Sequence, residues 1–190
     1  MAMFDGLSGM IVGRIMARMN EPAEREAVDL LAPIAGQHVL VIGFGPGIGL
    51  QYLLNTRPQV ALCGIDPSAV MVKAAAKLNR SALESGRLRL VQCGIAELTP
   101  DNGPFEGALA VNAIQMCEPV DHTARQLRAL LAPGARLITI THDWAMKKQA
   151  GSVANFVARL GDALTKAGFS QVESRAAIAE KGRAIIVECR

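Results

Sequence analysis

The sequence has little excess of charge of either sign. Its 20 Lys and Arg residues nearly balance 17 Asp and Glu residues, which leaves a formal net charge of +3 over 190 residues. Lys147-Lys148 is the one adjacent basic pair, and we interpret it as part of a solvated loop. Surfaces that bind nucleic acid need a basic stripe or cluster. We therefore expect no nucleic-acid partner.

Residues that hold metals or form disulfides are few and far apart. The four cysteines contain no CxxC pair, and the three histidines lack the spacing of a metal site. These residues are Cys63, Cys93, Cys117, Cys189, His38, His122 and His142. We expect a reduced, metal-free protein of the cytoplasm.

Long apolar runs are absent as well, and none reaches the roughly 18 residues of a membrane span. Two arginines interrupt the apolar stretch over 1–19 and no small-residue cleavage site follows it, so we expect no signal peptide. The helical spacing of its apolar residues predicts an amphipathic helix that packs on the core or contacts a membrane surface. A second helix is predicted over 23–31, after breaks at Asn20 and Pro22.

What the sequence does contain is an apolar strand that runs straight into a glycine turn. Residues 39–42 are followed by Gly43, Gly45, Gly47 and Gly49, and then by a helical pattern. Glycines remove the Cβ atoms that would keep a ligand from the backbone, and the unpaired N–H groups at the helix start create positive potential. This stretch predicts a site for an adenosine-containing cofactor.

The spacing of the turn helps to separate two cofactor classes. Dinucleotide sites use GxGxxG, whereas Gly43, Gly45 and Gly47 give GxGxG, and no Lys or Arg stands beside them to offset a pyrophosphate. A single carboxylate suits the site better, which leaves an NAD(P)-dependent oxidoreductase as a disfavoured alternative. A glycine turn that binds no cofactor is the other alternative.

Asp66 is the second candidate anchor. It ends the predicted strand over 60–66, about 20 residues after the glycine turn, where a carboxylate can accept both ribose hydroxyls. Its alternative role is to cap the predicted helix over 67–78, for which Ser68 is also suited.

These two segments resemble the first two motifs of class I S-adenosylmethionine-dependent methyltransferases. The segment VLVIGFGPG is similar to the first motif, and GIDPSAVMVKAAAKLN is similar to the second. The resemblance implies methyltransferase activity, with S-adenosylmethionine as the cofactor and S-adenosylhomocysteine as its product. The cofactor-binding residues that it implies are Gly43, Phe44, Gly45, Gly47, Asp66, Pro67 and Met71.

The sequence departs from the family pattern at two acids. Val41 stands where an acid often comes two residues before the first glycine, and Gly94 stands where an Asp usually binds the adenine amino group. Adenine contact would fall to the backbone of Gly94 and Ile95 or to Glu97, and Asp66 remains the main side-chain anchor. The loss of both acids also allows a catalytically silent cofactor-binding subunit.

Two candidate catalytic residues follow later strands. Asn112 comes after the predicted strand 106–111 and His142 after the predicted strand 135–141, so both should face the crevice outside the carboxyl ends of the sheet. Asn112 is also a candidate cofactor ligand. A histidine here is a natural general base near neutral pH, and a hydrogen-bonded structural role is the alternative.

Two subclasses of the family do not match this chain. The metal-dependent catechol type carries acids after strands four and five, and only Asp143 is available here, so we expect no magnesium site. The DNA and protein-glutamine methylases carry Asn or Asp followed by Pro-Pro-Tyr, whereas this chain reads Asn112-Ala113-Ile114-Gln115. We therefore do not expect methylation of amides or base amines.

We predict a single methyltransferase domain over 1–190 with a doubly wound, Rossmann-like α/β fold. Its seven-stranded sheet would be mostly parallel and closed by an antiparallel C-terminal hairpin. Residues 36–190 would form the cofactor-binding core, and the resemblance implies that residues 1–35 form a helical lid over the crevice. A helix capped by Asp121 and a last amphipathic helix over 153–164 complete the pattern.

The predicted reaction is in-line methyl transfer to a small, partly apolar metabolite, because the predicted lid is apolar and carries few charges. Methylation of a phospholipid head group at nitrogen is the second choice, and it depends on the same amphipathic helix. The atom that accepts the methyl group and the oligomeric state stay open.

Overall fold

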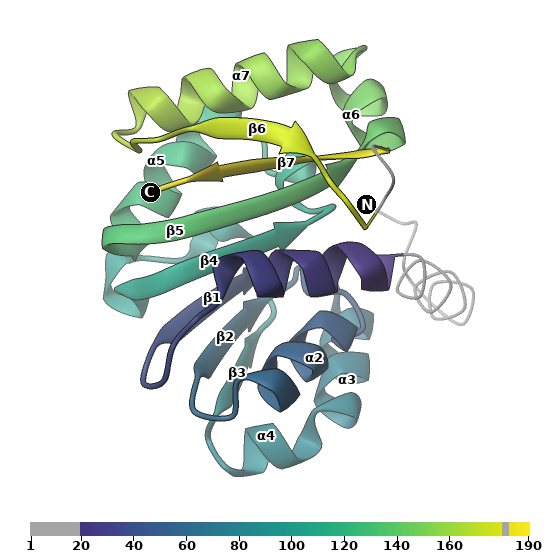
Figure 1. Ribbon diagram of the computed structural model, residues 1–190. Helices are drawn as coiled ribbons and strands as arrows, with labels where there is room; N and C mark the ends of the chain where they lie inside the picture. The colour runs from purple at the N-terminus through teal and green to yellow at the C-terminus, as the bar shows by residue number, and fades with distance from the viewer. Residues whose placement is uncertain (1–19, 180–182) are drawn as a thin grey trace.

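The computed structural model describes residues 20–179 and 183–190, which form one sheet covered by helices on both faces (Figure 1). The strands of this part follow the order β3-β2-β1-β4-β5-β7-β6. β1 to β5 run parallel, whereas β7 lies between β5 and β6 and is antiparallel to both. The strands are β1 (His38–Ile42), β2 (Ala61–Ile65), β3 (Leu88–Val91), β4 (Phe105–Val111), β5 (Leu131–His142), β6 (Glu173–Ala176) and β7 (Ala184–Cys189). This arrangement confirms the predicted Rossmann-like fold with its antiparallel C-terminal hairpin.

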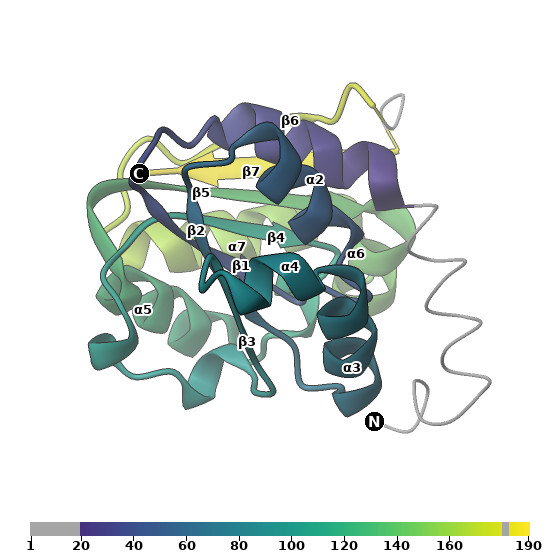
Figure 2. The ribbon, with the colours of Figure 1, turned by 90° about the horizontal axis from the view of Figure 1, so that it is seen from below.

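Helices lie on both sides of the sheet, and Figure 2 shows helix 20–31 and α2 on one face and α5 on the other. Side chains alternate along each strand, so Leu40 and Ile42 of β1 pack with α5 and α7, whereas Val39 packs with helix 20–31 and α2. The helices are helix 20–31, α2 (Ile48–Thr56), α3 (Ala69–Leu78), α4 (Arg80–Glu84), α5 (Val120–Leu130), α6 (Asp143–Ala150) and α7 (Val153–Lys166), with the single turns η1 (Ile95–Glu97), η2 (Pro100–Asn102) and η3 (Ile114–Met116). The apolar strands are thus buried on both faces, which is the pattern of a doubly wound sheet.

Helix 20–31 buries one apolar stripe against the sheet, made of Ala23, Ala27, Val28 and Leu31. These positions recur at helical spacing, so a single face of the helix meets the core. Asn20 and Pro22 both lie within helical structure. The prediction of a break at these two residues was therefore wrong, because the packing of the apolar stripe on the sheet outweighs the low helical propensity of proline.

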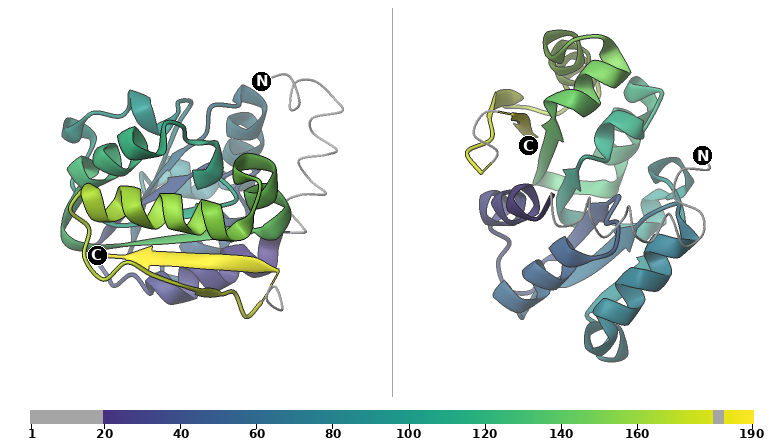
Figure 3. Two further views of the ribbon diagram at one scale, coloured as in Figure 1. Left: turned by 90° about the horizontal axis from the view of Figure 1, so that it is seen from above. Right: turned by 90° about the vertical axis from the view of Figure 1, so that its right-hand side faces the viewer.

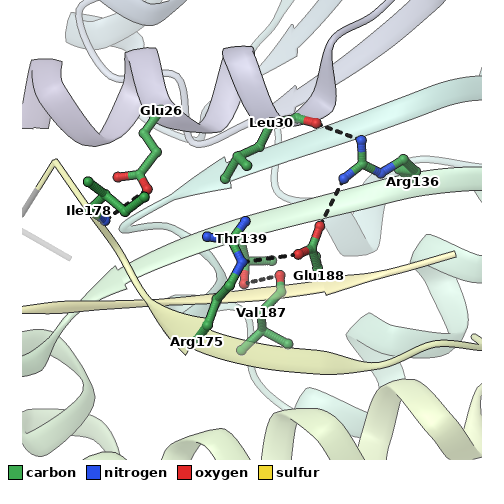
Figure 4. A network of polar contacts seen from close by, with 8 residues as sticks. All are labelled: Glu26, Leu30, Arg136, Thr139, Arg175, Ile178, Val187 and Glu188. Atoms are coloured by element: carbon green, nitrogen blue, oxygen red, sulfur yellow. Dashed lines mark hydrogen bonds and ion pairs between the residues drawn. The ribbon is translucent and has the colours of Figure 1, made fainter. Parts of the chain in front are cut away.

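Polar contacts fasten helix 20–31 to the far end of the chain (Figure 4). Arg136 of β5 donates to the Leu30 carbonyl oxygen at 2.6 Å and forms an ion pair with Glu188 of β7 at 2.8 Å. The Glu26 carboxylate accepts hydrogen bonds from the backbone N–H groups of Ile178 and Ala179, at 2.9 and 2.8 Å. Helix 20–31 is thus anchored on the sheet. The first helix of the predicted lid, over 1–19, lies outside the described residues, and the lid stays a prediction.

Two local predictions were wrong. Asp121 does not cap α5, because this helix begins at Val120 with Pro119 at the N-cap, and the Val120 N–H is bonded to the Glu118 carboxylate at 3.0 Å. The pair Lys147-Lys148 lies in the last turn of α6 and not in a loop. Cations are favourable at a helix C-terminus, so the pair stabilises the last turn of a helix whose apolar periodicity is weak.

Candidate functional site

The turn after β1 depends on glycine for two separate reasons. Gly43, Gly45 and Gly47 have φ angles of 65, 54 and 89°, a left-handed region that other residues rarely adopt. A Cβ at Gly43 would lie 2.5 Å from the Cβ of Ala113, and one at Gly47 would lie 2.8 Å from the Cβ of Ala75. A Cβ at Gly45, in contrast, would meet nothing within 4 Å. The turn is packed tightly at both ends and open in its middle, where a ligand can approach the backbone.

Asn79 holds the end of the turn in place. Its side chain is buried and donates from Nδ2 to the carbonyl oxygens of Gly47 and Ala75, both at 3.1 Å. These bonds connect the glycine turn to the end of α3. Sequence reasoning missed Asn79, because a lone Asn at the end of a helix carries no signal of a partner 32 residues away.

Asp66 lies directly beneath the open part of the turn. Its Oδ2 accepts from the Gly45 N–H at 3.0 Å and its Oδ1 from the Ser68 N–H at 2.9 Å. The N-cap of α3 is Ser68, whose Oγ accepts from the Met71 N–H at 3.4 Å. The capping role considered for Asp66 therefore belongs to Ser68. Asp66 instead joins the end of β2 to the glycine turn.

Burial raises the pKa of the Asp66 carboxyl, because the charged form loses solvation. The N–H groups of Ser68 and Gly45 act in the opposite direction and favour the carboxylate. A carboxylate offers about four acceptor sites, and these two bonds use only part of that capacity. Asp66 can therefore accept further donors from a ligand.

The residues of the predicted adenine segment lie after β3. The Gly94 N–H donates to the Glu97 carboxylate at 2.7 Å, and the intervening Ile95 is buried. Glu97 thus folds back onto its own turn, which favours the backbone over this side chain for any adenine contact. Of the second-motif residues, Met71 is buried in the first turn of α3 and Pro67 is exposed.

The two catalytic candidates touch each other. The Asn112 Oδ1 accepts from the His142 backbone N–H at 2.9 Å, and its Nδ2 lies 2.8 Å from the ring nitrogen Nδ1 of His142. Nδ2 also donates to the Asn20 side chain at 2.9 Å, and Gln115 Nε2 donates to the Asn112 carbonyl oxygen at 2.8 Å. Asn112 Oδ1 also lies 3.1 Å from Nδ1, so either atom of the amide can bond the ring. A neutral ring carries its proton on Nε2 when Nδ2 donates to Nδ1, and on Nδ1 when Oδ1 accepts from it.

An apolar surface adjoins this pair. Trp144, at the start of α6, is 52% exposed, and Met116, on the turn η3 after β4, is 67% exposed. The ring centroids of His142 and Trp144 lie 6.5 Å apart. The right-hand view of Figure 3 looks onto the edge of the sheet at which the parallel strands end. Trp144 is the single tryptophan of the sequence, whereas the sequence did not distinguish Met116 from a core residue.

A further acid reaches the glycine turn from helix 20–31. The pKa of Glu24 is raised from 4.5 to about 7, mainly by burial; the backbone N–H of Gly49 lowers it and neighbouring Glu21 raises it, and both effects are included in this value. Sequence reasoning missed Glu24, because a helical Glu is usually solvated and nothing in its spacing points to the turn.

Two kinds of feature are absent from the described ranges, 20–179 and 183–190. No three side chains of His, Cys, Asp or Glu gather there as a metal site would need. No helix within them has the length and apolar character to cross a membrane.

Comparisons with known proteins agree on one family. Residues 40–137 match the model of a family described as a methyltransferase domain. The chain is 29% identical to an uncharacterized methyltransferase, YdaC, of Bacillus subtilis over 127 residues, which is 67% of this chain and 68% of the relative. It spans only 42 to 45% of the length of three further curated relatives.

Two solved structures share the fold. A candidate S-adenosyl-L-methionine-dependent methyltransferase from Methanococcus maripaludis superposes with a TM-score of 0.78 at 16% identity, over 98% of this chain and 93% of that one. The 1,6-didemethyltoxoflavin-N1-methyltransferase of Burkholderia thailandensis, which holds 1,6-didemethyltoxoflavin and S-adenosylhomocysteine, gives a TM-score of 0.69 at 22% identity, over 92% and 80% of the two chains. At these identities the likeness concerns the fold alone.

Proposed function

Because this chain belongs to the methyltransferase-domain family, we propose that it transfers the methyl group of S-adenosylmethionine to a small, partly apolar metabolite. One observation carries the proposal. The open glycine turn with Asp66, the Asn112–His142 pair and the exposed Trp144 all lie at the carboxyl edge of the parallel strands. In open α/β sheets this edge is where ligands bind.

The residues of the turn fit the cofactor. The space above Gly45 is open, the Asp66 carboxylate has acceptor capacity left for ribose hydroxyls, and the backbone at Gly94 and Ile95 adjoins them after β3. No Lys or Arg of the turn would demand a phosphate. When bound, S-adenosylmethionine supplies a methyl group already activated by its sulfonium.

The role of the protein is then mainly to align the two reactants and exclude water. Alignment of bound reactants can contribute roughly 7 to 11 kcal/mol to lowering a barrier. In this proposal Asn112 orients the His142 ring through Nδ1. According to the tautomer that Asn112 selects, the ring donates a hydrogen bond to the acceptor molecule or takes a proton from it as a general base.

The size and character of the acceptor follow from the apolar surface. Trp144 and Met116 offer exposed apolar area beside His142, which suits a molecule with an apolar ring or chain. The B. thailandensis relative with the same fold holds 1,6-didemethyltoxoflavin. The phospholipid alternative depends on residues 1–19, which lie outside the described part. The family match gives no support to the oxidoreductase alternative.

Ligand-dependent thermal unfolding tests the proposal. S-adenosylhomocysteine at about 100 times its Kd should stabilise the protein by roughly 2.7 kcal/mol, and NADH and NADPH should not change Tm. A rise in Tm with NADH alone would contradict the proposal. Isotopically labelled S-adenosylmethionine, incubated with a panel of small hydroxylated and heteroaromatic compounds, would then identify the acceptor by label transfer.

A further inference from the structure

A second acid faces the glycine turn from the side opposite Asp66. Glu24 of helix 20–31 lines a small pocket with Val41 of β1, Gly43, Gly49 of α2 and Val111 of β4. A Cβ on Gly49 would lie only 3.0 Å from the Glu24 Oε2, so the carboxyl group rests against the first turn of α2. The other residues that line this pocket are apolar or glycine.

The protein satisfies the carboxyl group of Glu24 only in part, because the Gly49 N–H favours its charged form but one oxygen has no hydrogen-bond partner. Oε2 is shielded from solvent and accepts no hydrogen bond within the described part of the chain. Other acids of the same helix have partners, since Glu21 pairs with Arg25 at 2.5 Å and Glu26 accepts from two backbone N–H groups. A buried polar atom without a partner is costly and rare in folded proteins. Such an atom facing a pocket indicates that a ligand completes its bonding.

The charge that this ligand group should carry follows from the electrostatics of the pocket. Burial holds the pKa of Glu24 at about 7, so the group is poised between its neutral and charged forms near neutral pH. An adjacent cation favours the carboxylate, whereas an anion would oppose it. Among the residues that the structure describes, no Lys, Arg or His lines this pocket.

We propose that Glu24 binds the α-ammonium group at the methionine end of S-adenosylmethionine. The inference rests on the proposed function. β1 lies between β2 and β4 in the sheet. Asp66 stands at the β2 side of the glycine turn, and the Glu24 pocket stands at the β4 side, over Val41 and Val111. A cofactor whose ribose lies on Asp66 and whose chain crosses the turn carries its ammonium group toward this pocket.

The inference also explains how the site works without an acid at the end of β1. Val41 leaves that position apolar, and the carboxylate arrives instead from helix 20–31, 17 positions earlier in the sequence. The anchoring of this helix by Arg136 and Glu26 would then set the position of a cofactor ligand.

A comparison of two ligands distinguishes the ammonium contact from other effects of the substitution on binding. S-adenosylhomocysteine carries the amino-acid end, whereas 5′-methylthioadenosine keeps the adenosine and the sulfur but lacks that end. Calorimetry should show that Glu24→Gln weakens the binding of S-adenosylhomocysteine by about tenfold, the equivalent of roughly 1.4 kcal/mol. The affinity for 5′-methylthioadenosine should change by less than about twofold. Glu24→Asp, which keeps the charge on a shorter chain, should fall between. Asp29→Asn removes a charge from an exposed position of the same helix, outside the pocket, and should change neither affinity.

The outcomes are distinct. If Glu24→Gln weakened the binding of both ligands equally, or of neither, the proposed ammonium contact would be wrong. Failure of the wild-type protein to bind S-adenosylhomocysteine would overturn the proposed function and this inference with it. Circular dichroism and Tm of each free variant check the fold, and Gln is expected to be tolerated because it matches the shape of a protonated Glu.

Discussion

Replacing Glu24 with Gln should change how the free energy of unfolding depends on pH. Burial, with a further contribution from Glu21, raises the pKa of Glu24 from 4.5 to about 7 in the folded protein. Between these two values the folded state keeps a proton that the unfolded chain has released. Stability linked to this proton is therefore fully present below pH 4.5 and is lost as the pH rises through about 7.

The magnitude follows from the same interval. One pH unit corresponds to about 1.4 kcal/mol, so the interval from 4.5 to about 7 amounts to up to roughly 3 kcal/mol of stability lost by the wild-type protein. Gln cannot ionise and loses none of it. The free energy of unfolding of Glu24→Gln, relative to that of wild type, should therefore rise by up to about 3 kcal/mol between pH 4.5 and pH 8.

Urea unfolding of the ligand-free protein, followed by circular dichroism at pH 4.5, 6 and 8, would measure this difference. Other titrating groups contribute equally to both proteins and cancel when the two curves are subtracted. Asp29→Asn serves as the control, because it removes an exposed carboxylate of the same helix outside the Glu24 pocket. A constant difference between Glu24→Gln and wild type across this range would refute the reasoning.

Two further predictions concern the glycine turn and Asp66. Asp66→Ala should weaken the binding of S-adenosylhomocysteine by at least about tenfold, because charge-assisted hydrogen bonds contribute roughly 1.5 to 3 kcal/mol each. Asp66→Asn should fall between, and unchanged affinity by calorimetry would refute the ribose role. Gly43→Ala should cost more stability in urea unfolding than Gly45→Ala, since both force an unfavourable φ at roughly 1 to 2 kcal/mol but only the first also meets a neighbour, at 2.5 Å. Gly45→Ala should instead weaken ligand binding more than Gly43→Ala, and the reverse order of stabilities would contradict the packing argument.

Much of the sheet could be predicted because its signals are local. Apolar runs bounded by glycine and proline mark strands buried on both faces, and the turn at Gly43 and the acid at Asp66 follow their strands directly. Helix α6 was missed, since its eight residues carry too weak a stripe to distinguish them from a loop. Pro22 predicted a break where the chain is helical, because the packing of helix 20–31 on the sheet outweighs the low helical propensity of proline.

The parts of the site that were not predicted depend on contacts between distant segments. Asn112 and His142 were each placed at the crevice by their strands, but the bond between them joins residues 30 apart. Glu24 and Asn79 owe their roles to the packing of helix 20–31 and α3 around the glycine turn. Nothing in a single helix records which partner it will meet, so residues of this kind become visible only once the chain is folded.

The contact between Glu26 and Ile178 also sets the order in which the fold can be completed during synthesis. Glu26 and the Ile178 N–H that it binds are 152 positions apart. At synthesis rates of roughly 5 to 20 residues per second, on the order of 8 to 30 seconds separate the synthesis of these two residues. The residues that line the Glu24 pocket, from 24 to 111, are all made before this contact can form. The helix that carries Glu24 would therefore reach its final position on the sheet after the rest of its pocket.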